Sequence, residues 1–474
     1  MSGMSRRRFL RDLGGAAAGL AGWRWLTRAA PALAGEAATA SAPAAGRPNF
    51  VFILVDDLGW ADLGCYGSQF HRSPHLDRLA AEGMRFTDAY AACPVCSPTR
   101  ASILTGMYPA RFGITDWFPG SRPPKAAKLR PPKTRTHLPT EAVTIAEHLK
   151  PAGYATGYIG KWHLGGRAYW PEKQGFDVNI AGNARGQPPR YFSPYRMERI
   201  ADGPAGEYLT DRLTDEACRF ITAHKDRPFF LLLSHFAVHT PLQAKAETIA
   251  AFRARADKSK GQHNPTYAAM IAAMDDGVGK VMKTLADLKL ADNTVVIFFS
   301  DNGGDVRFTS NRPLYGGKSM LFEGGIRVPL IVRFPRAVKP GTVCRTPVMS
   351  TDFLPTMLEM ARVKPRAAAG LDGASLVPLL RQRGAPKRDT LYWHYPHYQG
   401  GAPCGAVRQG RWKLIDWYET GRTGLFDLTK DPGEKTNLTA SMPAKAAELR
   451  AALAAWRKRV GAAMPTPNPN RRGR

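Results

Sequence analysis

Four segments of the chain are continuously apolar and are bounded by turn residues. They cover residues 49–55, 228–234, 294–299 and 328–332. Runs of this kind are typical of strands that are buried on both faces of a sheet. Helical spacing of apolar residues occurs between them, over residues 73–82, 140–149 and 266–285. This alternation of strands and amphipathic helices predicts an α/β domain with a largely parallel sheet, over residues 49–365.

The pattern changes after about residue 365. Strand-like runs at residues 411–415 and 424–428 are short and separated by turns, and a helical pattern begins at Ala444. We therefore expect a smaller α+β subdomain with an antiparallel sheet over residues 366–460. The Pro-, Asn- and Arg-rich residues 461–474 predict a disordered tail.

The first residues carry a pattern typical of export. Consecutive arginines at residues 6–8 precede an Ala/Gly/Leu-rich stretch and an A-x-A site at residues 32–34. This predicts a twin-arginine signal peptide over residues 1–34 and a linker over residues 35–48, although an ordinary Arg-rich terminus is the alternative. No later segment has the apolar length of a membrane span. We therefore expect a periplasmic or secreted protein that uses the twin-arginine translocase and has no membrane anchor.

The charge of the chain narrows the choice of partners. The formal net charge is +28, and residues 1–34 hold six Arg and one Asp, which leaves +23 on the rest. A basic surface attracts polyanions. Aromatic residues are not interleaved with Lys and Arg in arrays, so nucleic acid is not an expected partner. Anionic glycans fit an exported protein better, and a general contribution to solubility is the alternative.

Acidic residues follow two of the predicted strands. Asp56 and Asp57 follow the first apolar run, and Asp301 and Asn302 follow the third. Ligands of open α/β sheets bind outside the carboxyl ends of the strands, where these oxygens would meet. A site made only of oxygens suits Ca²⁺ or Mg²⁺. The alternative is that these residues are turn formers and helix caps.

Basic and imidazole side chains occur in predicted loops. They are Lys161, His163, His239 and Lys318, and all but His239 lie in Gly-flanked stretches. Loops that follow apolar segments are where catalytic groups tend to lie. Together these residues predict a cationic pocket with two proton shuttles, which would stabilise a tetrahedral oxyanion. Taken singly, each lysine is more typical of the protein surface, and each histidine is more typical of a structural residue with its hydrogen bonds satisfied.

Cys93 and Cys96 are three residues apart and raise a separate question. A structural zinc site needs a second pair of cysteines at suitable spacing. The remaining cysteines are isolated at positions 65, 218, 344 and 404, which excludes that site. A redox pair stays open, although no thioredoxin-like setting surrounds it.

A third interpretation follows from the sequence around Cys96. Residues 96–106, CSPTRASILTG, resemble the signature C-[S/T/A]-P-x-R-x-S-x-L-T-G of the type I, formylglycine-dependent sulfatases, which include arylsulfatase A-like and carbohydrate sulfatases. Further segments that resemble this family in the same order are Asp56-Asp57, residues 160–165 (GKWHLG), Asp301-Asn302-Gly303, Lys318, residues 323–329 (EGGIRVP), residues 425–428 (LFDL), Asp431-Pro432 and Asn437-Leu438. The resemblance extends over about residues 48–440.

The resemblance implies a fold and two cofactors. The fold is alkaline-phosphatase-like, with a large mixed, mostly parallel sheet sandwiched by helices and a smaller C-terminal subdomain. Residues 49–365 would form the sulfatase catalytic domain. Cys96 would be oxidised to formylglycine, also called 3-oxoalanine, by a formylglycine-generating enzyme. One Ca²⁺ would be held by Asp56, Asp57, Asp301, Asn302 and the modified Cys96.

The resemblance also implies a role for each basic residue. The hydrated aldehyde attacks the sulfur of a sulfate ester while Lys161 and Lys318 neutralise the sulfate oxygens. His239, with Lys318, would protonate the leaving alcohol. His163 would be the base that takes the second proton of the diol and expels sulfate, and Arg100 would hold the diol by a charge-assisted hydrogen bond.

Two further segments bear on the substrate. Residues 122–135 form a Pro-rich stretch with six cations, which would hold anionic sugars or simply be solvated. Residues 392–398, YWHYPHY, would stack on sugar rings or form a core strand. With the basic charge, they favour a sulfated glycan over small sulfate esters. The chain most resembles the exo-acting carbohydrate sulfatases, which implies a substrate of the galactose or N-acetylgalactosamine type. The alternatives are a formylglycine-dependent phosphodiesterase or phosphonate monoester hydrolase, and a non-catalytic sulfated-glycan-binding protein.

Overall fold

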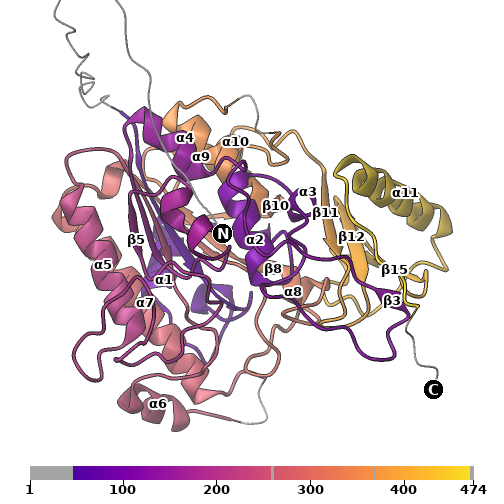
Figure 1. The fold of residues 1–474 in the computed structure, drawn as a ribbon, viewed down its shortest axis with the longest axis horizontal. Helices are drawn as coiled ribbons and strands as arrows, with labels where there is room; N and C mark the ends of the chain where they lie inside the picture. The colour runs from indigo at the N-terminus through magenta and orange to yellow at the C-terminus, as the bar shows by residue number, and fades with distance from the viewer. Residues whose placement is uncertain (1–45, 258–260, 367–369, 470–474) are drawn as a thin grey trace, which may run out of the picture. The chain divides into compact units, whose positions relative to one another are not determined.

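A computed structural model of the chain describes residues 46–257, 261–366 and 370–469 (Figure 1). The predicted signal peptide and most of the predicted linker lie outside these residues. None of the helices within the described ranges has the length and hydropathy that crossing a membrane requires.

The large sheet of the described chain has nine strands. They are β1 (Asn49–Val55), β2 (Met84–Tyr90), β4 (Ala155–Gly160), β5 (Val178–Ile180), β6 (Phe229–Ser234), β7 (Thr294–Ser300), β8 (Arg327–Arg333), β9 (Thr342–Cys344) and β10 (Val348–Met349). Their order is β10-β2-β8-β7-β1-β6-β4-β5, with β9 also paired to β2. Only β8 is antiparallel, to β2 and β7. The predicted fold, a mixed and mostly parallel sheet, is therefore confirmed.

Alternate side chains of β1 enter two different cores. Val51, Ile53 and Val55 pack in one cluster, and Phe50 and Phe52 pack in the other. Because successive strand residues point to opposite faces, a strand covered on both sides must be apolar throughout. This explains why the run at residues 49–55 is continuous rather than alternating.

Helices cover both faces of the large sheet. The helices are α1 (Pro74–Glu82), α2 (Cys96–Thr105), α3 (Pro109–Phe112), α4 (Ile145–Leu149), α5 (Leu209–Ala223), α6 (Ala246–Arg253), α7 (Pro265–Asp287), α8 (Glu323–Ile326), α9 (Phe353–Ala361), α10 (Val377–Leu380) and α11 (Pro443–Arg459). Short 3₁₀ turns lie at η1 (Gly64–Tyr66), η2 (Lys150–Ala152), η3 (Arg167–Tyr169), η4 (Pro171–Lys173), η5 (Ala291–Asn293) and η6 (Ser350–Asp352). Helices α1, α5 and α7 lie on one face, and α2, α4, α9 and α10 on the other (Figure 1).

Local capping sets where two of the predicted helices begin. Asn264 accepts hydrogen bonds from the backbone of residues 266 and 267, and Pro265 occupies the first helical position of α7. Helix α4 begins at Ile145, not at residue 140 as predicted, because Thr144 and Glu147 form a capping box.

A second, antiparallel sheet forms the C-terminal part of the fold. It runs β11 (Thr390–Tyr395), β12 (Cys404–Gln409), β13 (Trp412–Trp417) and β14 (Thr423–Asp427), and α11 packs on it (Figure 1). The expected α+β subdomain is thus present. The expected disordered tail is wrong in part, because β15 (Thr466–Pro467) pairs with β3 (Leu129–Arg130).

A buried set of charges joins the two sheets. We call it the interface charge cluster, and it consists of Asp88, Glu323, Arg327, Arg408, Lys413 and Glu434. Lys413 Nζ lies 2.9 Å from a carboxylate oxygen of both Glu323 and Glu434. Arg327 and Arg408 both bind Asp88, at 3.0 and 2.8 Å. Every charge of the cluster therefore has an opposite charge beside it, as buried ions require.

Candidate active site

Four neighbouring parallel strands present polar residues at one edge of the large sheet. The strands β7, β1, β6 and β4 lie side by side, so their carboxyl ends meet. The residues at these ends are Asp301 and Asn302 after β7, Asp56 and Asp57 after β1, Ser234 at the end of β6 and Lys161 after β4. The strand-end argument made from the sequence predicts this convergence correctly.

Three carboxylates converge at this edge. Asp56, Asp57 and Asp301 are buried and offer one oxygen each within 4.8 Å of one another. Asn302 donates to Asp57 Oδ1 at 2.8 Å, while Oδ1 of Asp56 and Oδ1 of Asn302 accept no hydrogen bond from the described protein. Burial raises the pKa of Asp56, and it raises that of Asp301 to about 6.

This donor set fits a hard cation. Unpartnered oxygens in a buried site are costly, and a cation is the partner that removes the cost for several oxygens at once. Carboxylate and amide oxygens are the ligands that Ca²⁺ and Mg²⁺ prefer. Four of the five residues expected to bind Ca²⁺, Asp56, Asp57, Asp301 and Asn302, therefore lie together.

Each carboxylate also has a cationic side chain beside it. Lys161 Nζ lies 2.5 Å from Asp56 Oδ2, and Lys318 Nζ lies 2.7 Å from Asp57 Oδ2. Burial alone would raise the pKa of Asp57, but Lys318, His239 and Lys161 together lower it. The pairing with Lys318 favours the ionised form of Asp57, and the two ion pairs hold both ammonium groups at the edge of the sheet.

Arg100 lies under the site rather than at its surface. Its Nε and Nη2 donate to Asp301 Oδ2 at 2.9 and 2.7 Å, and its Nη1 donates to the Lys161 carbonyl and the Ser234 hydroxyl. Among the described residues, none of its hydrogen bonds goes to Cys96. The expected contact of Arg100 with a modified Cys96 therefore stays a prediction, and the observed contacts position Asp301.

Cys96 begins helix α2 and faces an imidazole. Its Sγ lies 3.3 Å from Nδ1 of His163, whose Nε2 lies 2.7 Å from the Phe118 carbonyl oxygen. A ring that donates from Nε2 to this carbonyl presents Nδ1 to Cys96 as an acceptor. Burial, with Lys161 beside it, lowers the pKa of His163 to about 3.

His239 lies beside Asp57. Its Nε2 is 3.7 Å from Asp57 Oδ2, and its Nδ1 is 3.0 Å from the Thr240 carbonyl oxygen. Burial lowers the pKa of His239 to about 3 as well. The two histidines predicted from the sequence thus flank the same centre.

A cavity of about 730 Å³ opens over this centre. Of the residues expected to act in catalysis, Cys96, His163, His239 and Lys318 line it, whereas Lys161 and Arg100 lie beneath. Trp117, Phe118 and Pro119 form one wall, residues 184–187 another, and residues 305–307 a third. A cavity of this volume accommodates a ligand of one or two sugar rings.

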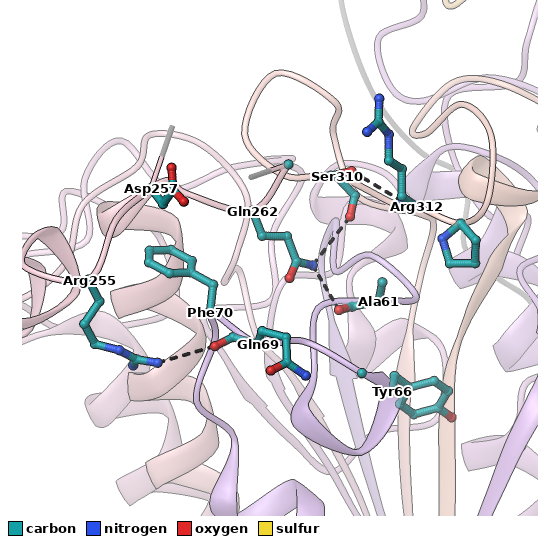
Figure 2. Close-up of a pocket in the computed structure, with 12 residues that line it drawn as sticks. Ala61, Tyr66, Gln69, Phe70, Arg255, Asp257, Gln262, Ser310 and Arg312 are labelled. Carbon is teal, nitrogen blue, oxygen red and sulfur yellow. Dashed lines mark hydrogen bonds between the residues drawn. The ribbon is translucent and has the colours of Figure 1, made fainter. Parts of the chain in front are cut away.

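A second cavity, of about 600 Å³, lies elsewhere (Figure 2). Gln262 spans it, donating to the carbonyls of Ala61 and Ser310, and Arg255 donates to the carbonyl of Gln69. None of the residues singled out from the sequence lines this cavity. It is therefore not where the predicted chemistry would take place.

The two segments considered for sugar binding do not line the reaction cavity. The cationic residues 122–135 follow the Trp117–Pro119 wall, and part of them pairs as β3 with β15. Residues 392–398 include β11, in which Trp393 is buried and donates to the Ala91 carbonyl, and Tyr392 stacks on Trp456. The core-strand interpretation of this aromatic segment is therefore the correct one.

Three positions in the site were not identified from the sequence. Ser234, which binds Arg100, ends a predicted strand, so the rule applied to Asp56 could have found it. The Phe118 carbonyl and Gly186, which packs on His163, gave no signal, because their contributions come from the backbone.

Comparisons with known proteins agree with this geometry. A family model described as Sulfatase matches residues 48–363, and one described as N-sulphoglucosamine sulphohydrolase, C-terminal, matches residues 314–459. N-acetylgalactosamine-6-sulfatase of Sus scrofa is 32% identical over 83% of this chain and 82% of its own length. Arylsulfatase A of Homo sapiens is 32% identical over 86% of each chain. A crystal structure of Ps i-CgsB in complex with k-i-k-neocarrahexaose is 32% identical, with a TM-score of 0.74 over 86% of this chain and 92% of that one.

Proposed function

The chain belongs to the sulfatase family and hydrolyses sulfate esters, and we propose that it does so with a formylglycine made from Cys96 and a bound Ca²⁺, on a sulfated carbohydrate. The observation that carries the proposal is the position of Cys96. Its sulfur lies on the wall of the reaction cavity beside His163, over a cluster of three buried carboxylates.

The chain's own residues divide into those that hold the cofactors and those that act on the substrate. Asp56, Asp57, Asp301 and Asn302 would hold Ca²⁺, which supplies positive charge to the sulfate oxygens. The formylglycine, when hydrated, supplies the hydroxyl group that attacks sulfur.

The basic residues would stabilise charge and move protons. Lys161 and Lys318 place two ammonium groups beside the carboxylates, where the sulfate oxygens would accumulate charge. His163 presents Nδ1 to residue 96 and would take a proton there. Lys318 and His239, which both lie beside Asp57, would deliver a proton to the leaving oxygen.

A carbohydrate is the substrate class that the chain favours. The cavity of about 730 Å³ is large enough for one or two sugar rings, and the formal charge of +23 on the chain without residues 1–34 attracts anionic glycans. A relative that is 32% identical is named for N-acetylgalactosamine 6-sulfate ester cleavage. We therefore place galactose and N-acetylgalactosamine sulfates first among candidates, with cleavage at a chain end.

The partners in this proposal are a formylglycine-generating enzyme and the twin-arginine translocase. Cys96 needs the enzyme, because its thiol is not itself the expected nucleophile. The pattern in residues 1–34 supports folded export to the periplasm or the medium.

The test combines a mass measurement with a comparison of two substrates. The peptide that contains residue 96 is analysed by mass spectrometry in the exported protein, and turnover of an aryl sulfate is compared with that of an aryl phosphodiester. We expect an aldehyde at residue 96 and faster cleavage of the sulfate. An intact thiol in protein that hydrolyses sulfate would refute the formylglycine, and faster cleavage of the phosphodiester would refute the substrate class.

A further inference from the structure

Three Lys and Arg side chains line the reaction cavity, and they differ in what they contact. Lys318 binds Asp57, and Arg307 forms an ion pair with Asp305 at 2.5 Å. The exposed side chain of Arg185 has no hydrogen-bond or ion-pair partner among the residues that the structure describes. Of these three cations, Arg185 is therefore the one whose charge the described part of the protein leaves unneutralised.

The backbone that carries Arg185 is fixed relative to the reaction centre. Arg185 donates its N–H to Asn183 Oδ1 at 2.9 Å, and the carbonyl of Asn183 accepts from the N–H of His163. The next residue, Gly186, packs so closely on the His163 ring that a Cβ there would lie 2.5 Å from Cε1. Gln187 in turn accepts a hydrogen bond from Thr240, next to His239. The arginine therefore projects from a segment tied to both histidines.

Apolar side chains of the other two walls suit the ring of a saccharide. The indole of Trp117 is half-buried, and its N–H donates to the side chain of Gln399, which fixes the plane of the ring. Phe118 and Val306 add apolar surface to the cavity, and Val306 is 54% exposed. Aromatic faces of this kind stack on the apolar faces of sugars, so a ring held there would have its substituents within the cavity that Arg185 also lines.

We propose that Arg185 binds a second anionic group of the substrate, so that the preferred substrate is a saccharide carrying a further sulfate or carboxylate beside the sulfate ester that is cleaved. This inference rests on the proposed function, because it assigns a partner to one wall of the same cavity. An arginine forms two parallel hydrogen bonds with either oxyanion, so both sources share one chemistry. The reacting sulfate has its own cations in Lys161 and Lys318, which leaves Arg185 for the second group.

The test measures binding separately from turnover. Dissociation constants are measured by titration calorimetry with Ca²⁺ present, in a Cys96→Ala background that cannot consume the ligand. The first pair of probes is N-acetylgalactosamine 6-sulfate and N-acetylgalactosamine 4,6-disulfate. The second pair is galactose 2-sulfate and galacturonic acid 2-sulfate, in which the added anion is a carboxylate.

We expect the doubly anionic member of one pair to bind about tenfold more tightly than the singly sulfated member. Arg185→Ala should remove that advantage, while the dissociation constant of the singly sulfated member should change less than about twofold. Arg185→Lys should restore part of the advantage, and added salt should weaken it. Arg122→Ala, which removes the same charge from a segment that does not line the cavity, should change neither ligand.

The outcomes separate this inference from the proposed function. Equal losses for both members of each pair in Arg185→Ala, or no preference in the parent protein, would overturn the second anion site. The pair that responds identifies the anion as sulfate or carboxylate. Failure of the parent protein with native Cys96 to hydrolyse p-nitrophenyl sulfate would instead count against the proposed function.

Discussion

Replacing Gly186 with alanine should slow turnover about a hundredfold by displacing the imidazole of His163. A Cβ at this position would lie 2.5 Å from Cε1 and 2.7 Å from Nε2 of the ring. Ordinary contacts of a Cβ begin near 3.4 Å, so the ring or the segment must move by nearly 1 Å. The backbone at Gly186 has no positive φ, so an alanine strains only this contact.

The ring has little freedom to move without losing a partner. Its Nε2 lies 2.7 Å from the Phe118 carbonyl oxygen, and its Nδ1 lies 3.3 Å from Cys96 Sγ. A shift of about 1 Å in a catalytic group costs on the order of a hundredfold in rate. At about 1.4 kcal/mol per factor of ten, this corresponds to roughly 2.7 kcal/mol of transition-state stabilisation.

The assay is hydrolysis of p-nitrophenyl sulfate, with kcat and KM measured separately. Gly166→Ala is the matched control, because a Cβ there meets no atom within 4 Å and the backbone φ is −77°. Mass analysis of the peptide containing residue 96 ensures that both variants carry the same modification. Full turnover by Gly186→Ala, with that modification in place, would refute the role of His163 and the packing argument together.

Three further predictions concern stability and the metal. Lys413→Met leaves Glu323 and Glu434 without their shared buried cation and should lower the free energy of unfolding in urea by about 3–5 kcal/mol. The control, Lys283→Met, removes an exposed ion pair and should lower it by less than about 1 kcal/mol. Equal losses would contradict the buried pairing. Burial raises the pKa of Glu434 to about 7 from 4.5, so the stability that its protonated form contributes is lost as the pH rises through that window. The Tm of Glu434→Gln should therefore fall less than that of the parent protein between pH 5 and 8. Parallel Tm curves for the two proteins would exclude this titration. Treatment with EDTA should abolish turnover and lower Tm, and Ca²⁺ should restore both, because the site leaves carboxylate and amide oxygens unpartnered; unchanged activity would exclude a required metal.

The sequence predicted the parts of the site that depend on strand ends and local motifs. Asp56 and Asp301 follow buried strands, and parallel strands bring such ends together whatever the connections between them. The strand at residues 328–332 was also predicted, but not its direction, because a continuously buried run looks the same in a parallel and an antiparallel pairing.

Contacts between distant segments could not be predicted in this way. Arg100 binds Asp301, 201 positions away, and an arginine four positions after Cys96 in the sequence gives no indication of that partner. The pairing of residues 466–467 with residues 129–130 joins two segments that each look disordered by composition, because each supplies the other's missing backbone partners. Composition records what a segment contains, whereas these features depend on what lies opposite it.

The C-terminal sheet has a role in the reaction cavity as well as in the fold. Gln399 and Gly400, between β11 and β12, line the cavity, and a Cβ on Gly400 would lie 2.3 Å from the carbonyl oxygen of Ser319, next to Lys318. Four residues further on, Glu323 is held by Lys413 of β13. The segment that follows Lys318 is thus contacted by the C-terminal part of the fold at Ser319 and at Glu323. A mutation in the interface charge cluster should therefore affect catalysis by displacing the Lys318 ammonium group. Lys413→Met protein that remains folded should therefore show a lower kcat, and an unchanged kcat would limit the second sheet to a stabilising role.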